Sequence, residues 1–386
     1  MGPEDLKTFA HHGRIIFKMT EHGSINRLVI ETDAYDYHLT GHIIEALPNV
    51  PRITAPAYNT NKKPLPPDMG KHTLRLLSFK GDFLKPCPGT RNYICCGYQI
   101  LNVGTNCPLD CSYCILQDYF NKPDLRVFVN YEKELDRIFD HIDKNPSRMF
   151  RIGTGEFTDS LALDPITQWS KVLIPRFSAR KNAILELKTK TINIDNIIKS
   201  KYRDRIIISW SLNSQHICST EEHRAPAIKR RLEAARICQR EGFVLGFHFD
   251  PIIAYPGWKK GYLETIELMD KYIDPKGIAW ISMGSMRFMP TLKTIVMKRH
   301  PDTRIFIGEF IDGLDGKKRY FKPIRIELYG FMRKHLERWH NDLGLYLCME
   351  SDEIWKKGLG WSPGTSEGLS DYLDSRVLPE RWGAYR

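Results

Sequence analysis

The sequence predicts an α/β protein built around a partial (β/α)6 barrel. Between residues 98 and 299, short runs rich in β-branched and aromatic residues alternate with longer segments of helical periodicity. This alternation indicates parallel strands, because a helix of this length must return the chain to the start of the next strand. Polar or glycine-rich residues follow several strands, at the edge where the active sites of such barrels lie.

Six candidate strands and the candidate helices between and after them carry this prediction. The strands are expected at 98–103, 149–152, 184–187, 205–210, 243–249 and 277–283. The helices are expected at 132–143, 165–179, 194–200, 225–240, 259–272 and 291–299. In the fourth helix, four apolar residues recur at helical spacing and define one face: Ile228, Leu232, Ala235 and Cys238. The loops expected to converge begin near Gly104, Gly153, Lys188, Ser211 and Asp250.

The barrel is expected to have a region on either side. The three predicted regions are an N-terminal extension (1–95), the barrel (96–300) and a C-terminal region (301–386). In the extension, 14–17 and 27–30 are candidate short strands, and a proline cluster between positions 48 and 67 predicts a linker or surface loop. In the C-terminal region, extended runs at 304–311 and 324–328 flank a basic turn and predict a hairpin.

The composition is typical of a globular protein and favours a polyanionic partner. A chain of 386 residues with 42% hydrophobic content can bury a substantial core. It shows no apolar leader and no apolar stretch near the ~18–20 residues that cross a bilayer, so we expect a cytoplasmic protein without a membrane partner. Nine cysteines without the dense pattern of a disulfide scaffold indicate reduced thiols, some of them ligands. A net charge of +11 favours a polyanionic partner.

A short loop after the first predicted strand contains Cys107, Cys111 and Cys114, spaced x3 and then x2. Three thiolates are one fewer than a closed zinc site or a four-thiolate iron–sulfur site requires, so a cluster held here keeps one iron open. The alternatives are unrelated buried thiols and a zinc site completed by Cys95, Cys96 or His141.

The cysteine spacing, Tyr113 just before the third cysteine, and the position after the first strand resemble the radical S-adenosylmethionine superfamily. This resemblance implies a [4Fe-4S] cluster whose open iron binds S-adenosyl-L-methionine, and cofactors that supply a 5′-deoxyadenosyl radical.

Gly153-Thr154-Gly155-Glu156 resembles the stretch that contacts the methionine amino group in this superfamily. Glycine permits close backbone approach, and a carboxylate balances an ammonium group. A glycine-rich turn with a solvated glutamate is the alternative.

Residues 95–335 resemble, in collinear order, the spore photoproduct lyase family of DNA repair enzymes. The matching stretches are 111–117, 126–130, 189–190, 210–214, 245–252, 257–258, 287–288 and 301–304. The resemblance implies that Lys190 and Ser211 contact S-adenosylmethionine, with Asn213 nearby and Tyr113 packed at the cluster. It also implies an electron donor such as ferredoxin or flavodoxin. The alternatives are a surface lysine, a strand end and a turn-forming asparagine.

Asp250 and its neighbour His248 lie at the end of the fifth predicted strand. Asp250 is expected to face the site, where it could bind the adenosine ribose or the substrate. A histidine within a buried strand is more often a core residue than a ligand. The candidate catalytic residues are Glu156, Tyr113 and Asp250.

Two positions depart from the family pattern. Family members carry a hydrogen-donating cysteine after the second strand and a tyrosine after the third cluster cysteine, where this chain has Glu156 and Ile115. A carboxylic O–H bond is too strong to replace a thiol as hydrogen-atom donor, and isoleucine cannot relay a hydrogen atom. The open explanations are a different substrate, quenching by 5′-deoxyadenosine, and another donor such as Tyr113, Tyr119 or Cys218.

The basic turn contains Lys317, Lys318, Arg319 and Tyr320. The family resemblance implies a hairpin that inserts at a DNA lesion, where cations hold phosphates and aromatic rings stack on bases. A solvated charged hairpin is the alternative.

Three functional hypotheses follow. The first is a radical S-adenosylmethionine enzyme that acts on a nucleic-acid base, with repair of a thymine lesion in DNA as its specific form. The second is a radical enzyme that modifies a peptide, an RNA base or a small metabolite. The third is a non-catalytic, metal-stabilised nucleic-acid-binding protein.

Overall fold

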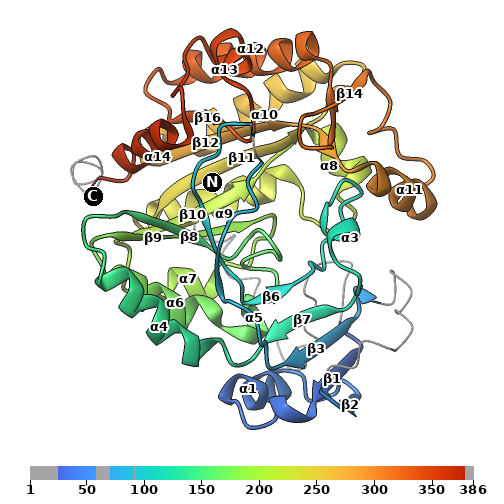
Figure 1. The fold of residues 1–386 in the computed structure, drawn as a ribbon, viewed down its shortest axis with the longest axis vertical. Helices are drawn as coiled ribbons and strands as arrows, with labels where there is room; N and C mark the ends of the chain where they lie inside the picture. The colour runs from blue at the N-terminus through green and yellow to red at the C-terminus, as the bar shows by residue number, and fades with distance from the viewer. Residues whose placement is uncertain (1–24, 58–69, 91, 379–386) are drawn as a thin grey trace, which may run out of the picture.

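The computed structural model describes residues 25–57, 70–90 and 92–378, and its centre is a sheet that curls into a half-barrel (Figure 1). The strand order is β16-β12-β11-β10-β9-β8-β5-β4. These strands are β4 (Leu84–Pro86), β5 (Gln99–Leu101), β8 (Phe150–Gly153), β9 (Ala183–Thr189), β10 (Ile206–Ser211), β11 (Val244–Ile252), β12 (Ile278–Ser285) and β16 (Leu345–Leu347). Neighbouring strands pair in parallel, except that β4 is antiparallel to β5.

The six predicted barrel strands are confirmed as β5 and β8 to β12, with ends within a few residues of the expected positions. Their two faces differ in chemistry because side chains alternate along a strand. In β10, Ile208 and Trp210 alternate with Ser209 and Ser211, and all four are buried. We call the polar, concave side of the sheet the lumen face, defined by Glu186, Lys188, Ser209, Ser211, His248 and Asp250.

Helices cover the outer side of the sheet, and α6 and α9 pack against the strands β9 to β11. The helices between the barrel strands are α4 (Tyr131–Asp143), α5 (Asp164–Thr167), α6 (Trp169–Ser178), α7 (Asp195–Ile198), α8 (Gln215–Glu221), α9 (Ile228–Arg240) and α10 (Trp258–Tyr272). After the last of these strands, α11 (Pro290–Arg299) packs instead on α3 (Leu116–Tyr119). The predicted apolar face of α9 is confirmed as buried. The helix expected at 165–179 is instead two helices, because Gln168 takes a left-handed conformation (φ 53°) that ends the first.

The N-terminal residues form a second sheet that shares strands with the barrel region. Its order is β2-β1-β3-β7-β6. The elements are β1 (Arg27–Glu31), α1 (His38–Ala46), β2 (Arg52–Ala55), β3 (Thr73–Leu77), β6 (Gly104–Thr105) and β7 (Leu125–Phe128). The strand expected at 27–30 is confirmed, whereas the one expected at 14–17 lies outside the described residues. Part of the proline-rich stretch is not a linker, because β2 pairs in parallel with β1.

The C-terminal region corrects part of the predicted hairpin. β14 (Phe310–Asp312) and β15 (Lys318–Tyr320) pair antiparallel, with β13 (Arg287–Phe288) beside β15. The run 324–328 is not a strand but the start of the helix α12 (Lys322–Trp339). Pro323 in its first turn suits a helix start, and Leu328, Met332 and Leu336 recur on its buried face.

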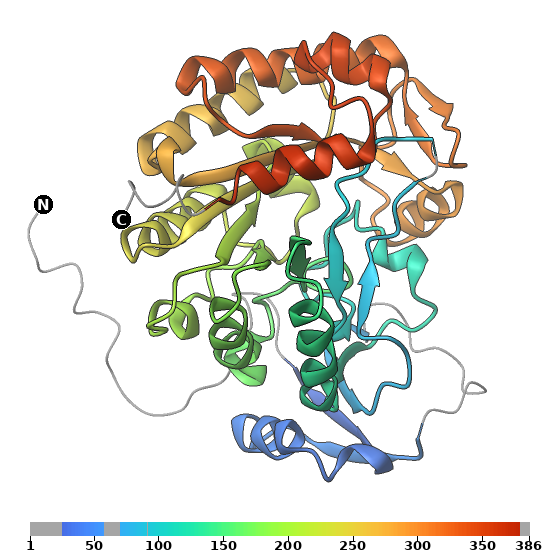
Figure 2. The same cartoon turned by 60° about the vertical axis from the view of Figure 1, so that its left-hand side comes forward.

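The end of the chain folds back over the barrel. Helices α13 (Asp352–Leu359) and α14 (Ser366–Ser375) follow β16, which pairs with β12 as the last strand of the main sheet. Figure 2 shows this C-terminal layer at one end of the molecule and α1 at the opposite end. None of the helices in the described residues is long and apolar enough to pass through a membrane.

Candidate active site

The three-cysteine loop is a tight turn between β6 and the short helix α3 (Leu116–Tyr119). Asn106 and Asp110 bend it with left-handed conformations (φ 67° and 54°). The Lys71 ammonium donates to the Cys107 carbonyl at 2.6 Å. The Gln117 amide donates to the carbonyls of Cys111 and Ser112 at 3.1 and 3.0 Å. The loop backbone is therefore fixed from outside the turn, which leaves the thiols free to act as ligands.

The thiols of this loop lie close enough to influence one another. Burial raises the pKa of Cys107 to about 12, and Asp159 and Cys114 add to the shift. Burial likewise raises the pKa of Cys111 well above its usual range; Lys190 lowers it, and Glu222, Cys114 and Cys107 raise it. Buried thiolates therefore need compensating positive charge, and metal ligation supplies it. Three thiols on one short loop, one fewer than a four-thiolate site requires, fit a [4Fe-4S] cluster that keeps one iron open.

The zinc alternative required a fourth ligand close to the loop. Among the described residues, no three histidine, cysteine or acidic side chains, the loop cysteines included, are grouped closely enough to hold a metal ion. This result bears equally on zinc and on a cluster, and it is the three-cysteine spacing of the loop that favours the cluster.

A buried ion pair between Glu222 and Arg231 contacts the cysteine loop through Tyr113. Glu222 forms an ion pair with Arg231, both side chains are 0% exposed, and the Tyr113 hydroxyl donates to Glu222. The other Arg231 contacts tie this pair to β10 and α8, because its guanidinium donates to the Ser211 carbonyl at 3.0 Å and to Cys218 Sγ at 3.1 Å. The Tyr113 hydroxyl is thus committed to Glu222, and its packing against a cluster stays a prediction.

Glu222 and Arg231 were missed by the sequence interpretation. The available signal was a charged residue on the apolar face of α9, since Arg231 lies one turn after Ile228 and one turn before Ala235. A buried arginine requires a buried acidic partner. The sequence does not say which carboxylate supplies it.

Lys190 and Ser211, the expected cofactor contacts, lie at the ends of β9 and β10. The Lys190 ammonium lies 5.5 Å from the centre of the Tyr113 ring, and its charge acts on Cys111. Asn213 follows β10 and is held by hydrogen bonds to neighbouring elements. Its side chain donates to the Pro251 carbonyl at 2.9 Å and accepts from the Tyr262 hydroxyl at 2.6 Å, so it joins β10 to β11.

The stretch Gly153-Thr154-Gly155-Glu156 follows β8 and passes close to neighbouring chain segments. A Cβ atom on Gly153 would lie 1.7 Å from the Tyr98 hydroxyl, and one on Gly155 would lie 2.9 Å from Lys188 Cβ. Both positions therefore require glycine. Glu156 is partly exposed, with 30% of its side chain accessible, and its carboxylate is ion-paired with Lys188. The positive charge of Lys188 therefore offsets the negative charge of the carboxylate that was expected to bind the methionine amino group.

A hydrogen-bond network centred on Glu186 lies deeper on the lumen face. One Glu186 oxygen accepts from Ser209 at 2.5 Å, His248 at 2.8 Å and Trp280 at 2.9 Å. Burial raises the pKa of Glu186, but the stronger combined effect of His248, Lys188 and Ser209 lowers it to about 2. His248 is thus a hydrogen-bonded core residue, as expected.

This network makes folding sensitive to acid. The pKa of Glu186 is lower in the folded protein than its usual value of 4.5, so its stabilising effect is complete above about pH 4.5 and is lost as the pH falls towards 2. We expect the wild type to lose roughly 3 kcal/mol more of its unfolding free energy over this window than Glu186→Gln. Denaturant titrations at several pH values measure the difference, and parallel curves would contradict the assignment.

Asp250 lies at the carboxyl end of β11 and is paired. Its two oxygens accept from the Arg287 guanidinium at 3.1 and 2.8 Å. Burial raises the pKa of Asp250, and Arg287 more than reverses this effect, so the group stays ionised. Gly284 gives the pair its space, since a Cβ there would lie 2.5 Å from Arg287 Nη1. The lumen face therefore holds two ion pairs, Glu156–Lys188 and Asp250–Arg287.

Two of the four residues predicted to contact nucleic acid, Arg319 and Tyr320, are buried. Arg319 is 1% exposed and pairs with Asp315 at 2.6 Å, and Tyr320 is fully buried with its hydroxyl accepting from the Ala254 amide. Lys317 and Lys318 are partly buried and pair with Asp315 and Asp312 at 3.5 and 2.8 Å. These side chains hold the hairpin to the protein, and Arg319 and Tyr320 are not available to a nucleic acid in this conformation.

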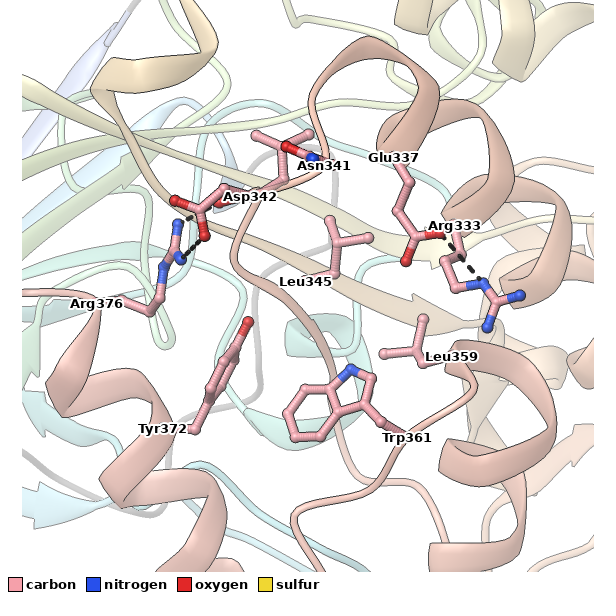
Figure 3. A pocket seen from close by; sticks show the side chains of 10 residues that line it. Arg333, Glu337, Asn341, Asp342, Leu345, Leu359, Trp361, Tyr372 and Arg376 are labelled. Carbon is pink, nitrogen blue, oxygen red and sulfur yellow. Dashed lines mark hydrogen bonds and ion pairs between the residues drawn. The ribbon is translucent and has the colours of Figure 1, made fainter.

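A separate pocket of about 350 Å³ opens between α12, the segment 341–345 and α14. Figure 3 shows Trp361 and Tyr372 on one side and Arg333 with Glu337 on the other. None of the predicted site residues lines it, so the pocket is distinct from the cysteine loop and the lumen face.

Comparisons with known proteins agree with this architecture. The family model described as spore photoproduct lyase matches residues 95–334. Spore photoproduct lyase from Geobacillus sp. (strain Y412MC61) is 26% identical over 223 residues, which are 57% of this chain and 63% of that protein. The Bacillus subtilis (strain 168) protein is 26% identical over 221 residues, 56% of this chain and 63% of that protein. The match thus spans less than two thirds of the length of these relatives.

Solved structures of spore photoproduct lyase share the fold. A variant solved with S-adenosylmethionine and dinucleoside spore photoproduct gives a TM-score of 0.75 at 21% identity, covering 85% of this chain and 99% of that one. A complex with dinucleoside spore photoproduct gives 0.74 at 22% identity, covering 83% and 98%. The half-barrel and its cysteine loop define a radical S-adenosylmethionine fold. Because the family model matches more than half of the residues, the chain belongs to the spore photoproduct lyase family.

Proposed function

We propose that this protein is a radical S-adenosylmethionine enzyme that acts on a damaged base in DNA. The observation that carries the proposal is the presence of three thiols, Cys107, Cys111 and Cys114, on one short loop whose backbone is held by Lys71 and Gln117. When bound, the [4Fe-4S] cluster and S-adenosylmethionine supply a 5′-deoxyadenosyl radical. The relatives named for spore photoproduct support a thymine lesion as the substrate.

The chain's own residues would hold and orient these groups. The three thiolates ligate the cluster, and the Lys190 ammonium beside Cys111 offsets their negative charge. Ser211, whose carbonyl accepts from Arg231, would contact S-adenosylmethionine. The Glu156 carboxylate, which is ion-paired with Lys188, would also accept from the methionine amino group. An electron donor such as ferredoxin or flavodoxin would reduce the cluster. None of the nine cysteines forms a disulfide, which supports a location in the reducing cytoplasm.

The charged lumen face favours a second candidate. Spore photoproduct bases are neutral, whereas this face presents the ion pairs Glu156–Lys188 and Asp250–Arg287. Such pairs suit a substrate with charged or strongly polar groups near the reacting atom, because the partners exchange one ionic contact for another. A radical enzyme that modifies a peptide, an RNA base or a polar metabolite fits this observation.

The decisive experiment is anaerobic turnover with a defined substrate. Reconstituted and reduced protein is incubated with S-adenosylmethionine and dinucleoside spore photoproduct, and 5′-deoxyadenosine and thymidine dinucleoside are quantified by mass spectrometry. Lesion repair predicts that both products form. The second candidate predicts 5′-deoxyadenosine without loss of the dinucleoside. A wild-type protein that never forms 5′-deoxyadenosine contradicts both.

A further inference from the structure

Cys348 lies at the edge of the lumen face, directly after the last barrel strand. Its amide donates to the Met283 carbonyl at 2.8 Å, which continues the pairing of β16 with β12. In that pairing Tyr346 is opposite Ser282, and Ser282 is opposite His248 of the lumen face. Because side chains two residues apart share one side of a strand, Cys348 is directed to the same side as Tyr346, one step nearer the carboxyl end.

The sulfur of Cys348 contacts the Asp250–Arg287 pair. Arg287 Nη2 lies 3.4 Å from Cys348 Sγ and 2.8 Å from Asp250 Oδ2. A guanidinium can only donate, so the sulfur accepts and its own S–H bond is free to point elsewhere. The aspartate balances the charge of Arg287, which weakens its pull on the thiol proton.

The thiol keeps its hydrogen atom. Burial raises the pKa of Cys348 well above its usual range; Arg287 lowers it, and Asp250, Cys96 and Cys87 raise it. A hydrogen-atom donor must be an S–H group rather than a thiolate, and this environment favours the S–H form.

The hydrogen-atom donors considered from the sequence are less suitable because of their contacts, exposure or bond strength. The Tyr113 hydroxyl donates to Glu222, and Cys218 Sγ lies behind the loop at 3.1 Å from Arg231. Tyr119 is 53% exposed and stacks on Phe157. Glu156 is ion-paired, and its carboxyl group has no weak O–H bond to give.

We propose that Cys348 donates the hydrogen atom that quenches the carbon radical of the product. This proposal rests on the proposed radical chemistry and names a further catalytic residue for it. The S–H bond of Cys348 breaks homolytically, a C–H bond forms on the product, and the sulfur becomes a thiyl radical. One electron from the ferredoxin or flavodoxin class of donor and one proton from solvent return the thiyl radical to a thiol.

Turnover of dinucleoside spore photoproduct in D2O tests the donor, because a thiol hydrogen exchanges with solvent. The wild type is expected to place deuterium on the repaired dinucleoside. Cys348→Ala and Cys348→Ser should each lower this deuterated product at least tenfold, since serine keeps the size but has a strong O–H bond. Both variants should still form 5′-deoxyadenosine and bind the dinucleoside within twofold of the wild-type affinity. The matched control Cys238→Ala, which removes a buried thiol of α9, should label as the wild type does.

A second measurement needs no cofactor. The infrared difference between metal-free wild type and Cys348→Ala should contain an S–H stretching band that shifts in D2O. The donor assignment is overturned if that band is missing, if Cys348→Ala labels the product normally, or if labelling is lost in Cys87→Ala or Cys96→Ala instead. Wild-type protein that forms no 5′-deoxyadenosine overturns the proposed function, while the infrared band still reports on Cys348.

Discussion

Cys111→Ala is expected to leave a folded protein that cannot hold the cluster. The wild type should bind about four irons per chain after anaerobic reconstitution, as a [4Fe-4S] cluster requires. With one of three protein ligands removed, iron content and the brown absorbance should fall to near zero. Formation of 5′-deoxyadenosine from S-adenosylmethionine should be lost with them.

Cys238→Ala is the control for this variant. Cys238 is also buried, but it lies on the apolar face of α9 rather than in the loop, so its removal should leave iron binding intact. Iron analysis and 5′-deoxyadenosine measurement on the two variants separate ligand loss from thiol loss. Full iron content in Cys111→Ala would show that this loop does not hold the cluster.

Arg231→Met should produce the largest loss of stability among the single substitutions considered. The substitution leaves Glu222 buried without its cation, and breaking a fully buried ion pair from one side costs about 3–5 kcal/mol. The Ser211 carbonyl and the Tyr113 hydroxyl lose a fixed neighbour at the same time. Denaturant unfolding of the metal-free protein measures this cost directly.

Two further variants show whether the cost comes from an uncompensated charge. Arg231→Met combined with Glu222→Gln removes both charges and should recover much of the lost stability, which a double-mutant cycle quantifies. Lys229→Met, on the exposed side of the same helix, breaks only a surface pair and should change stability by less than about 1 kcal/mol. Equal losses in Arg231→Met and Lys229→Met would refute the buried-pair interpretation.

The barrel and the cysteine loop were predictable because their signals are local. Strands such as β10 are short runs of β-branched residues, and α9 shows its buried face within one segment of chain. The spacing of Cys107, Cys111 and Cys114 likewise lies within eight residues. Each of these features is set by neighbours in sequence, so the pattern alone indicates the structure.

The parts of the hairpin prediction that were wrong depend on contacts between residues distant in sequence. Lys317 to Tyr320 read as an exposed basic turn, but Asp315 and the chain around Met349 bury Arg319. The run 324–328 contains alternating apolar residues that suit a strand, yet Pro323 and the apolar positions that follow one turn apart make it helical. The pairs Glu222–Arg231 and Asp250–Arg287 depend on tertiary contacts, which a local pattern does not record.

The outer strands β4 and β16 extend the folding unit beyond the residues that match the family model. Both lie outside residues 95–334, the part of the chain that matches the family model. A fragment trimmed to those residues would retain the three loop cysteines and expose the hydrogen-bonding edges of β5 and β12 together. Open parallel and antiparallel edges pair with other chains. The limits of sequence similarity therefore divide this barrel, and a fragment expressed with those boundaries should aggregate through its open sheet edges.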